Sequence, residues 1–270
     1  MPTPFVKMHG LGNDFIVIDD FTRASDTRLN SETGMKLCDR RHGIGADQIL
    51  WLRKPHDSKS ADLRMEIINN DGSIAEMCGN GIRAVALYLN QITPKSSYRI
   101  ETLAGIKIVE IRGDQVDVDM GEPQLKAGFA NAAGEHLTAL GKTYSFFEVG
   151  MGNPHAIIFV DDVLKFPAGD VGPAIEHLPR FPKRTNVEFV QILGPKLIRT
   201  RVWERGAGLT LACGTGACAA AAAAIALGKV TMPLEVALPG GSLIIRWEGQ
   251  GKSLFMKGPA TEVFRGEIEI

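Results

Sequence analysis

The alternation of hydrophobic and polar residues predicts a chain made mostly of β-strands. Residues 106–112 partly alternate between apolar and polar side chains, a turn follows at Gly113, and residues 116–120 alternate again. Two such segments around a glycine turn are typical of a β-hairpin. Residues 234–247 contain a second pair of this kind, with Gly240 in its turn.

Helical patterns are few, and the two clearest each follow a cysteine. Residues 81–90 come after Cys78-Gly-Asn, and residues 216–227 come after Cys213-Gly-Thr. The second segment is rich in alanine and has no charged residue from 217 to 227, which argues against an exposed helix. Its small side chains would let a sheet wrap closely around it.

The spacing between these landmarks repeats along the chain. Cys213 lies 135 positions after Cys78, and each cysteine lies nine residues after a polar residue that ends a strand-like segment, Asn69 or Glu204. The pair Gly12-Asn13 before an apolar run is echoed by Gly152-Asn153, which lies 140 positions later. Three matches in one order at nearly one offset indicate a duplicated unit.

We therefore predict an α+β fold of two pseudo-symmetric domains, each a curved, mostly antiparallel sheet wrapped around a central helix. Residues 1–120 would form the first half and carry Cys78, and the C-terminal strand 262–270 is expected to join it. Residues 121–261 would form the second half and carry Cys213. The 270 residues are enough for two hydrophobic cores.

Composition and charge point to a small-molecule substrate. Thirty basic and 31 acidic residues nearly cancel, so no overall field attracts nucleic acid or an anionic membrane. The N-terminus lacks the pattern of a signal peptide, and the longest apolar run is shorter than the roughly 20 residues that span a bilayer. Four cysteines in this length do not make a disulfide scaffold. We expect a cytoplasmic protein with reduced thiols, and the sequence leaves a homodimer open.

The positions of Cys78 and Cys213 suggest reactive thiols. A helix N-terminus favours negative charge, because its first N–H groups lack helical partners and the macrodipole is positive there, so a thiol at that point loses its proton more easily. The glycines that follow each cysteine allow a ligand close to the backbone, and such N–H groups hold carboxylates. Thiol and carboxylate site thus occur together in both halves.

A thiol from each half suits the inversion of a stereocentre. One base removes a proton from one face of a carbon, and an acid delivers a proton to the other face. A thiolate and a thiol can exchange these roles, which makes the reaction reversible. The residues alone therefore favour a racemase or an epimerase, with Cys78 and Cys213 as its catalytic pair.

The other cysteines and the remaining motifs carry less chemistry. We interpret Cys38 and Cys218 as small buried hydrophobic residues. The sequence has no C-x-x-C pair, and Cys213 with Cys218 has the wrong spacing for a zinc site. It also lacks a complete dinucleotide fingerprint and a Walker loop. We expect neither a metal nor another cofactor.

Eight segments, taken together and in order, resemble diaminopimelate epimerases. They are His9–Phe15, Gly43–Gln48, Asn69–Ser73, Glu76–Gly81, Gly152–His155, Arg184–Val187, Trp203–Gly206 and Ala212–Gly216. The resemblance implies the fold of that family and the conversion of L,L- to meso-diaminopimelate in lysine and peptidoglycan precursor biosynthesis. It implies that no pyridoxal phosphate or metal takes part, and that Cys78 and Cys213 transfer the proton.

The resemblance also implies roles for polar residues around the two cysteines. His155 and Glu204 would tune the thiols. The residues implied to contact substrate are Asn13, Gln48, Asn69, Gly79, Asn80, Asn153, Asn186, Glu204, Arg205, Gly214 and Thr215. The distal amino-acid end would be recognised by Asn69, Asn153, Asn186 and Arg205, and Glu204 would pair with an ammonium group.

Each of these polar residues also has a structural explanation. Asn13 and Asn153 follow glycine and suit turns, Gln48 could be an ordinary strand residue, and His155 could be a hydrogen-bonded core histidine. Glu204 and Arg205 could form a surface ion pair. We interpret Asn70 and Asp71 as turn formers. The ensemble of segments is what favours function.

Three other functions stay open. Proline racemases and hydroxyproline epimerases share the architecture, but they typically carry a histidine after the first Cys-Gly and an acidic residue before the second cysteine, where Asn80 and Ala212 stand here. The related phenazine-type isomerases lack the cysteine pair. A cysteine-nucleophile hydrolase would use one thiol with His155 and leave the second unexplained. A non-catalytic amino-acid-binding module would need neither thiol.

Overall fold

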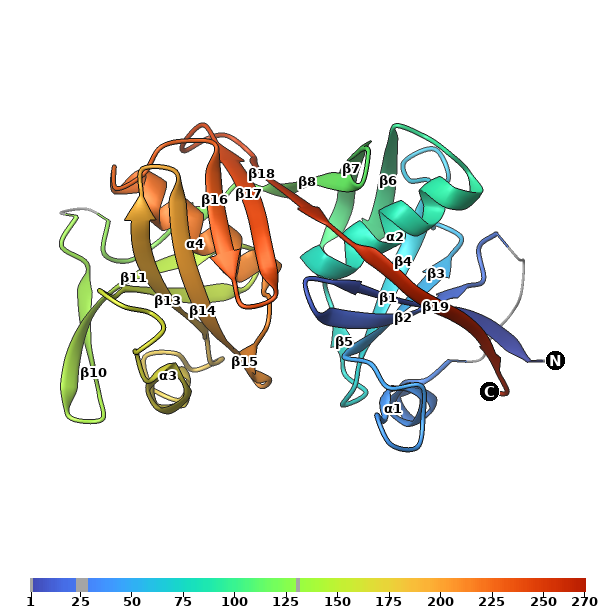
Figure 1. The fold of residues 1–270 in the computed structure, drawn as a ribbon, viewed down its shortest axis with the longest axis horizontal. Coiled ribbons are helices and arrows are strands. Elements are labelled where there is room, and N and C mark those ends of the chain that lie inside the picture. The colour runs from blue at the N-terminus through green and yellow to red at the C-terminus, as the bar shows by residue number, and fades with distance from the viewer. Residues whose placement is uncertain (1, 23–28, 130–131) are drawn as a thin grey trace. The chain divides into compact units, whose positions relative to one another are not determined.

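The computed structural model describes residues 2–22, 29–129 and 132–270. The chain divides into two compact units, and each is described by itself. Unit 1 holds the chain up to Val118 together with Gly258–Ile270, and unit 2 holds Asp119–Lys257. The sequence placed these limits at residues 120 and 262. In Figure 1 the last strand, drawn in red, lies beside the first strand of unit 1, drawn in blue.

Unit 1 is built from nine strands and two helices among its described residues. They are β1 (Thr3–Gly10), β2 (Asn13–Asp19), α1 (Ser31–Cys38), β3 (Gln48–Arg53), β4 (Leu63–Asn69), β5 (Ile74–Ala75), α2 (Gly79–Ile92), β6 (Ser97–Thr102), β7 (Gly105–Arg112), β8 (Gln115–Gly121) and β19 (Thr261–Ile268). The hairpin predicted from the alternation after residue 105 is β7 and β8, which pair antiparallel.

Unit 2 contains ten strands and two helices among its described residues, and from β11 onward they follow the order of unit 1. They are β9 (Gln124–Leu125), β10 (Glu135–Ala139), β11 (Lys142–Gly150), β12 (Pro154–Phe159), α3 (Ala168–Glu176), β13 (Asn186–Gly194), β14 (Leu197–Glu204), β15 (Gly208–Thr210), α4 (Gly214–Ala226), β16 (Leu234–Leu238), β17 (Gly241–Trp247) and β18 (Leu254–Pro259). The second predicted hairpin is β16 and β17.

The strand pairings show that the two units share one topology. In unit 1, β1–β2 is antiparallel, β2–β3 parallel, β3–β4 antiparallel and β4–β6 parallel, and β6, β7 and β8 continue antiparallel. In unit 2 the same sequence of pairings runs through β11, β12, β13, β14, β16, β17 and β18. The predicted duplication is confirmed, and it lets residues of the two units be matched by strand register.

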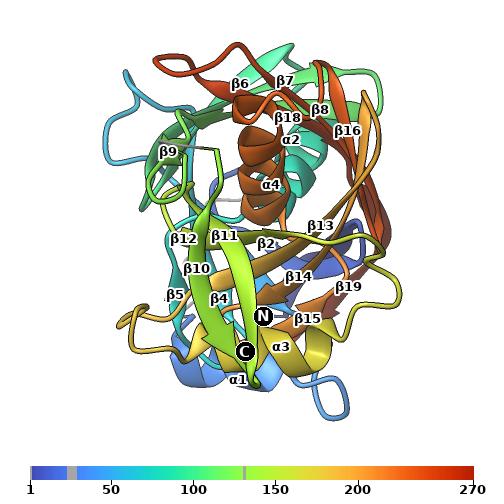
Figure 2. The ribbon, with the colours of Figure 1, turned by 90° about the vertical axis from the view of Figure 1, so that its left-hand side faces the viewer.

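Each sheet curves around one central helix, as predicted. The helix α4 contacts strands from β11 to β17, and Figure 2 shows it enclosed by them. Its side chains from Ala217 to Ala224 have no exposed surface, because alanine lets the strands approach on every side. In unit 1, α2 contacts β1, β2, β7 and β19 in the same way.

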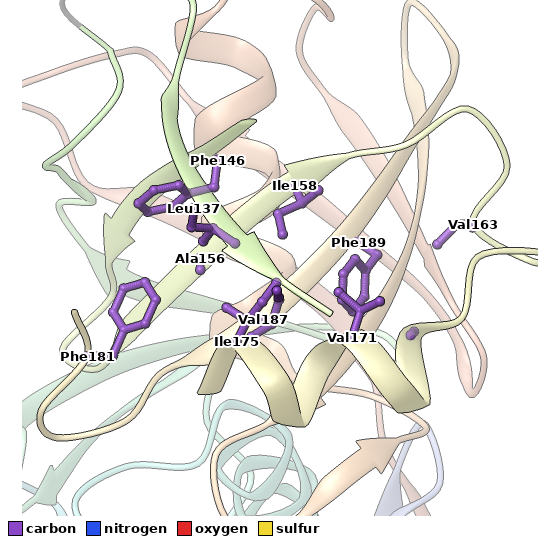
Figure 3. Close-up of a cluster of buried hydrophobic side chains, with 12 residues drawn as sticks. Leu137, Phe146, Ala156, Ile158, Val163, Val171, Ile175, Phe181, Val187 and Phe189 are labelled. Carbon is purple, nitrogen blue, oxygen red and sulfur yellow. The ribbon is translucent and has the colours of Figure 1, made fainter. Parts of the chain in front are cut away.

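A second helix in each unit covers the outer face of the sheet. In unit 2, Val171 and Ile175 of α3 pack onto Val187 and Phe189 of β13 in a buried cluster (Figure 3). Successive strand residues point to opposite faces, so the residues that alternate with this cluster face α4 instead. The strand β13 therefore carries one row of side chains to a hydrophobic core and another toward the start of α4.

Candidate active site

Both candidate cysteines occupy the N-cap of a central helix. Cys78 caps α2 and its sulfur accepts a hydrogen bond from the N–H of Gly81 at 3.2 Å, while Cys213 caps α4 and accepts from Gly216 at 3.3 Å. Oxygen-bearing side chains such as serine and aspartate usually fill this position. Sulfur in their place receives the positive end of the helix, which favours a thiolate.

Around Cys78, asparagine side chains form the candidate site of unit 1. The Cys78 thiol donates to the Oδ1 atom of Asn13 at 3.6 Å, and the Nδ2 group of Asn80 donates to the same oxygen at 3.2 Å. Asn13 is held from behind, where its Nδ2 group donates to Asp47 at 2.9 Å. The structure thus brings Asn13 and Asn80, both predicted from the resemblance, onto Cys78, and Gly79 lies in the same first turn of α2.

Gln48 and Asn69 lie side by side on paired strands of the same unit. The Nε2 group of Gln48 donates to Oδ1 of Asn69 at 2.8 Å, and Nδ2 of Asn69 donates to Ser73 at 2.8 Å. The Oε1 atom of Gln48 is buried and has no hydrogen-bond partner among the described residues. A buried acceptor without a partner is costly, and it suits a site that a donor such as an ammonium group fills.

Around Cys213, the candidate site of unit 2 is more polar. Cys213 Sγ lies 3.5 Å from the Thr215 hydroxyl, and Nδ2 of Asn153 lies 3.3 Å from that hydroxyl. The Oδ1 atom of Asn153 lies 2.8 Å from Nε2 of His155. The predicted residues Asn153, His155 and Thr215 are thus linked to Cys213 through hydrogen bonds. Gly214, which was also predicted, lies between Cys213 and Thr215 in the sequence.

The charges around Cys213 favour its neutral form. Burial raises the pKa of the Cys213 thiol well above its usual range, and the nearby carboxylates of Glu204 and Glu188 raise it further. Hydrogen bonds from Thr215 and Gly216 act in the opposite direction. Burial also raises the pKa of Glu204, although hydrogen bonds from Thr210 and from the thiol oppose this shift. Burial, and then the two carboxylates, thus favour the thiol form of Cys213 over the thiolate.

Asn186 and Arg205 are joined through the backbone. Nδ2 of Asn186 donates to the carbonyl of Pro154 at 2.9 Å, and its Oδ1 accepts from the backbone N–H of Arg205, also at 2.9 Å. The Arg205 side chain is exposed and donates to the Lys183 carbonyl at 3.3 Å. Asn186 thus fixes the turn that presents the guanidinium group.

A comparison with known families decides which reaction class this arrangement belongs to. The family model described as diaminopimelate epimerase matches residues 5–126 and 147–263. The chain belongs to the diaminopimelate epimerase family. Both cysteine N-caps and their asparagine neighbours lie inside the matched ranges.

Curated relatives agree with this family along the whole chain. A diaminopimelate epimerase of Carboxydothermus hydrogenoformans is 50% identical over 273 residues, covering 97% of this chain and 98% of the relative. One of Synechocystis is 46% identical over 282 residues, covering all of both chains.

Solved structures share the fold with this diaminopimelate epimerase family member at low identity. A PhzF-family phenazine biosynthesis protein of Bacillus anthracis has a TM-score of 0.75 at 17% identity, with all of both chains covered. A hydroxyproline epimerase of Agrobacterium vitis has a TM-score of 0.72 at 16% identity, covering 99% of this chain and 91% of that one. At these identities the likeness extends to the fold alone.

Three residues that the sequence did not single out support the two cysteine sites, one in each unit. Asp47 holds Asn13 and accepts a hydrogen bond from Arg40 at 2.8 Å. Arg83 is fully buried in α2 and donates to Oδ1 of Asn80 and to the Gly79 carbonyl, both at 3.0 Å. A fixed first turn of α2 follows from these contacts. An arginine four residues after Gly79 in an apolar helix was the available signal.

Glu188 is the third missed residue, and it lies behind Cys213. Its Oε1 atom is 2.7 Å from Nδ1 of His155, and both side chains are fully buried. A glutamate within the apolar run from Val187 to Val190 was the signal in the sequence. The sequence predicted no element for that run and gave the charge no role.

Neither a metal-binding cluster nor a membrane-spanning helix occurs among the described residues. Within residues 2–22, 29–129 and 132–270, no three or more histidine, cysteine, aspartate or glutamate side chains are grouped as a metal ion would need. Over the same part of the chain, no helix has both the length and the apolar character to cross a bilayer.

Proposed function

We propose that this protein is an isomerase that interconverts L,L- and meso-diaminopimelate, in lysine and peptidoglycan precursor biosynthesis. Membership of the diaminopimelate epimerase family and the names of relatives at 44–50% identity support the substrate. The observation that carries the chemistry is the repeated N-cap cysteine, one at the start of each central helix. We propose Cys78 and Cys213 as the two bases, without pyridoxal phosphate or a metal.

The reaction moves one proton and leaves no net change on the enzyme except which sulfur holds the proton. A thiolate accepts the α-proton, and the electrons of the broken C–H bond delocalise into the adjacent carboxylate as an enediolate. The second thiol then donates its proton to the opposite face of the carbon, and a new C–H bond forms with inverted configuration. This requires both cysteine sites to act on one α-carbon.

The enediolate needs hydrogen-bond donors, because a proton beside a carboxylate is very weakly acidic. The first turns of α2 and α4 offer backbone N–H groups at Gly79, Asn80, Gly214 and Thr215, the residues proposed to contact the reacting carboxylate. Donors fixed before the reaction stabilise the charge as it develops and require no reorganisation.

The resting enzyme starts with Cys213 as the acid, in this proposal. Burial and the two carboxylates that raise the pKa of Cys213 keep it protonated at neutral pH. Strand register places Leu50 and Asn69 of unit 1 at the positions of Glu188 and Glu204 in unit 2. Cys78 therefore lacks carboxylates at the two matching positions, which favours it as the resting base.

Recognition of the distal end gives specificity. We propose that Gln48, Asn69, Asn153 and Asn186 supply amide contacts, that Arg205 binds the distal carboxylate, and that Glu204 pairs with an ammonium group. The unpartnered Oε1 atom of Gln48 supports a donor at that point. A substrate without the distal groups would leave such polar atoms unpaired, which excludes simple amino acids.

A small molecule is thus the proposed partner, with no nucleic acid or membrane, and a homodimer remains part of the proposal. We also propose a cytoplasmic location, because free thiols persist in reducing compartments. Among the described residues, the cysteines at positions 38, 78, 213 and 218 form no disulfide bond. Proline racemase activity is the second candidate, favoured only by the shared fold of hydroxyproline epimerases.

The test is turnover of L,L-diaminopimelate in D₂O, with α-deuterium followed by NMR and stereochemistry by chiral chromatography. Wild type should form meso product with deuterium at one α-carbon. Cys78→Ala and Cys213→Ala should each lose epimerisation by about 10²–10⁴-fold or more. Cys218→Ala is the matched control, because that thiol is buried in α4 away from the helix start and should be dispensable.

Two outcomes would contradict the proposal. Full epimerisation by both single cysteine variants would exclude the two-base mechanism. Turnover of proline, with no exchange on diaminopimelate, would assign the chain's activity to the second candidate.

A further inference from the structure

The duplicated fold lets one buried pair in unit 2 be compared with its counterpart in unit 1. Parallel pairing aligns Phe15 with Gln48 in unit 1 and His155 with Asn186 in unit 2. Two residues farther along, Leu50 of β3 matches Glu188 of β13. All four side chains, Phe15, Leu50, His155 and Glu188, are fully buried.

The fold itself therefore does not need a histidine and a glutamate at these positions. Unit 1 forms the same sheet around the same kind of helix with an aromatic and an aliphatic side chain there. Burying an ionisable pair costs desolvation that an apolar pair avoids. The pair His155–Glu188 is thus a departure from the repeat, and it lies on the face of the sheet that meets the start of α4.

We propose that Glu188 is a positioning residue, which orients Asn153 and through it the groups around Cys213. This inference rests on the proposed function. The connection is a chain of five side chains, in the order Glu188, His155, Asn153, Thr215 and Cys213. The successive distances are 2.7, 2.8, 3.3 and 3.5 Å.

The hydrogen bonds that join these five side chains run in a defined donor-to-acceptor direction, which is set at the buried Glu188 end. Oxygen atoms flank both nitrogens of the His155 ring, Oε1 of Glu188 at Nδ1 and Oδ1 of Asn153 at Nε2. A proton must therefore lie in each of the two contacts, whichever partner formally carries the one shared with Glu188. The ring consequently donates from Nε2 to Asn153.

The orientation of Asn153 then decides what Cys213 receives. With its Oδ1 accepting from the ring, Asn153 directs its Nδ2 group at the Thr215 hydroxyl. A hydroxyl that accepts from Asn153 has its own hydrogen free to donate to the sulfur of Cys213. If Nδ1 of the ring lost its partner, the ring could hold its proton on the other nitrogen. Asn153 would then turn over, and Thr215 would donate to it instead of to sulfur.

The glycine at the start of α4 supports this placement of Glu188. A Cβ atom built at Gly216 would come within 2.8 Å of Oε1 of Glu188, and the matching Cβ at Gly81 in unit 1 would meet Leu50 at 2.9 Å. Glu188 thus packs against the first turn of α4, where the N–H of Gly216 donates to the Cys213 sulfur. The second oxygen of Glu188, Oε2, is buried and has no hydrogen-bond partner among the described residues. Such a group is retained at a cost, which indicates a role other than stability.

Glu188→Leu and Glu188→Gln together test the proposal. Leucine reproduces the residue of unit 1 and leaves Nδ1 of His155 without a partner, so kcat should fall about 10- to 100-fold, the usual loss when a partner that orients an active-site group is removed. Glutamine can donate to or accept from Nδ1 and should restore kcat close to wild type. Asn153→Ala combined with Glu188→Leu should be no slower than Asn153→Ala alone, because Glu188 acts through Asn153.

A stability control separates positioning from folding. The double variant His155→Phe with Glu188→Leu rebuilds the apolar pair of unit 1, and it should melt at or above the wild-type temperature while remaining slow. Normal kcat in Glu188→Leu would overturn the proposal. So would a glutamine variant as slow as the leucine one, or losses that multiply in the combination with Asn153→Ala.

NMR of ¹⁵N-histidine tests the same inference in the wild-type protein, and a variant is needed only to assign the signal. The His155 signal, assigned by its loss in His155→Gln, should show a proton on Nε2 across the assay pH range. An unprotonated Nε2 would overturn the proposed direction of the chain. This measurement stands even if wild type fails to turn over diaminopimelate, which would refute the proposed function instead.

Discussion

Single residues make the two sulfur atoms unequal, although their backbones are alike. Both cysteines are N-caps in extended conformation, and each sulfur accepts a hydrogen bond from the backbone N–H of the residue three positions later. The difference lies in what stands behind them, since unit 2 has Glu188 and Glu204 at the positions of Leu50 and Asn69. A pair of equivalent bases would have equal charge states at rest, whereas a proton-transfer pair needs one acid and one base.

Glu204→Gln should make Cys213 more reactive. The pKa of Cys213 is raised first by burial and then by the Glu204 charge, so removing that charge lowers the pKa and increases the thiolate fraction, by up to about tenfold. The other groups that act on this thiol, which are Glu188, Thr215 and the N–H of Gly216, stay in place. The rate of iodoacetamide alkylation at Cys213, measured between pH 8 and 10 in a Cys78→Ala background, reports the change.

Cys38 provides the internal reference for that experiment. Burial raises the pKa of Cys38 to about 11, and this residue lies in unit 1, so its alkylation should not respond to Glu204→Gln. Slower or unchanged alkylation of Cys213 would contradict the charge effect.

Gln48→Met should weaken substrate binding with little effect on stability. Methionine has nearly the shape of glutamine and removes the buried oxygen that has no partner among the described residues, along with the donor to Asn69. We expect KM for diaminopimelate to rise about tenfold, the equivalent of about 1.4 kcal/mol, with a smaller change in kcat. Steady-state kinetics and thermal unfolding check this. An unchanged KM would show that Gln48 does not contact substrate.

The sequence identified the residues within two hydrogen bonds of the sulfur atoms better than those behind them. Asn13, Asn80, Asn153 and Thr215 carried signals because each lies in a glycine-rich segment that the resemblance covers. Arg83 lies in a predicted helix whose pattern gave it no separate role, and Glu188 lies in a segment for which the sequence predicted no element. Their roles depend on which strand faces which helix, and that information appears only in the folded chain.

Among the elements, the start of α4 shows steric contact overriding helix propensity. Alanine is favoured over glycine in helices by about 1 kcal/mol. At Gly216, however, an added Cβ would meet Glu188 at 2.8 Å and the Cys213 sulfur at 3.2 Å. These neighbours therefore leave no room for a side chain at residue 216. The backbone N–H of the same residue donates to the Cys213 sulfur.

Gly216→Ala should destabilise the protein by about 1–3 kcal/mol, the usual cost of overpacking, and should also lower kcat. Gly169→Ala in α3 is the matched control. Its new Cβ would lie 3.4 Å from Leu209, an ordinary contact, so this variant should be unchanged or up to about 1 kcal/mol more stable. Denaturant unfolding of both variants decides the point. Equal stability of the two would show that the turn can relax.

The elements that the sequence predicted are those with a regular pattern. The hairpins β7–β8 and β16–β17 and the helices α2 and α4 follow from alternation, from the cysteine starts and from the alanine run. The helix α3 did not, because Gly169, Gly172 and Pro173 are poor helix formers. It forms because Val171 and Ile175 are buried in the outer core of unit 2 (Figure 3).

For the whole molecule, the duplication was predictable from spacing, but the unequal charge of the halves was not. In unit 1, hydrogen bonds and ion pairs lower the pKa of the half-buried Asp14, where Arg40 and Lys7 outweigh the effect of burial. In unit 2, burial raises the pKa of Glu188 and Glu204. The two units should therefore respond to acid with opposite sign.

The sign follows from proton linkage. A carboxyl whose pKa is raised by folding binds protons more tightly in the folded state, so it contributes stability that is present below its unfolded pKa near 4.5 and lost as pH rises. A carboxyl whose pKa is lowered, such as Asp14, contributes stability above about 3.8 that is lost as pH falls further. Unit 2 should gain stability from pH 7 to 4.5, and unit 1 should lose stability below about pH 4.

Hydrogen exchange with mass spectrometry can follow both units in one sample. Between pH 7 and 4.5, after correction for intrinsic exchange, peptides from β13 and β14 should become better protected. Peptides from β2 and β3 should lose protection below about pH 4. Glu188→Gln with Glu204→Gln should flatten the response of unit 2 and leave unit 1 unchanged. If both units instead weakened together from pH 7 downward, the buried carboxyls of unit 2 would have to be charged and stabilised by partners. That outcome would leave the raised pKa of Cys213 explained, because charged carboxylates beside the thiol raise its pKa in the same direction as burial does, and it would refute only the opposite acid response of the two units.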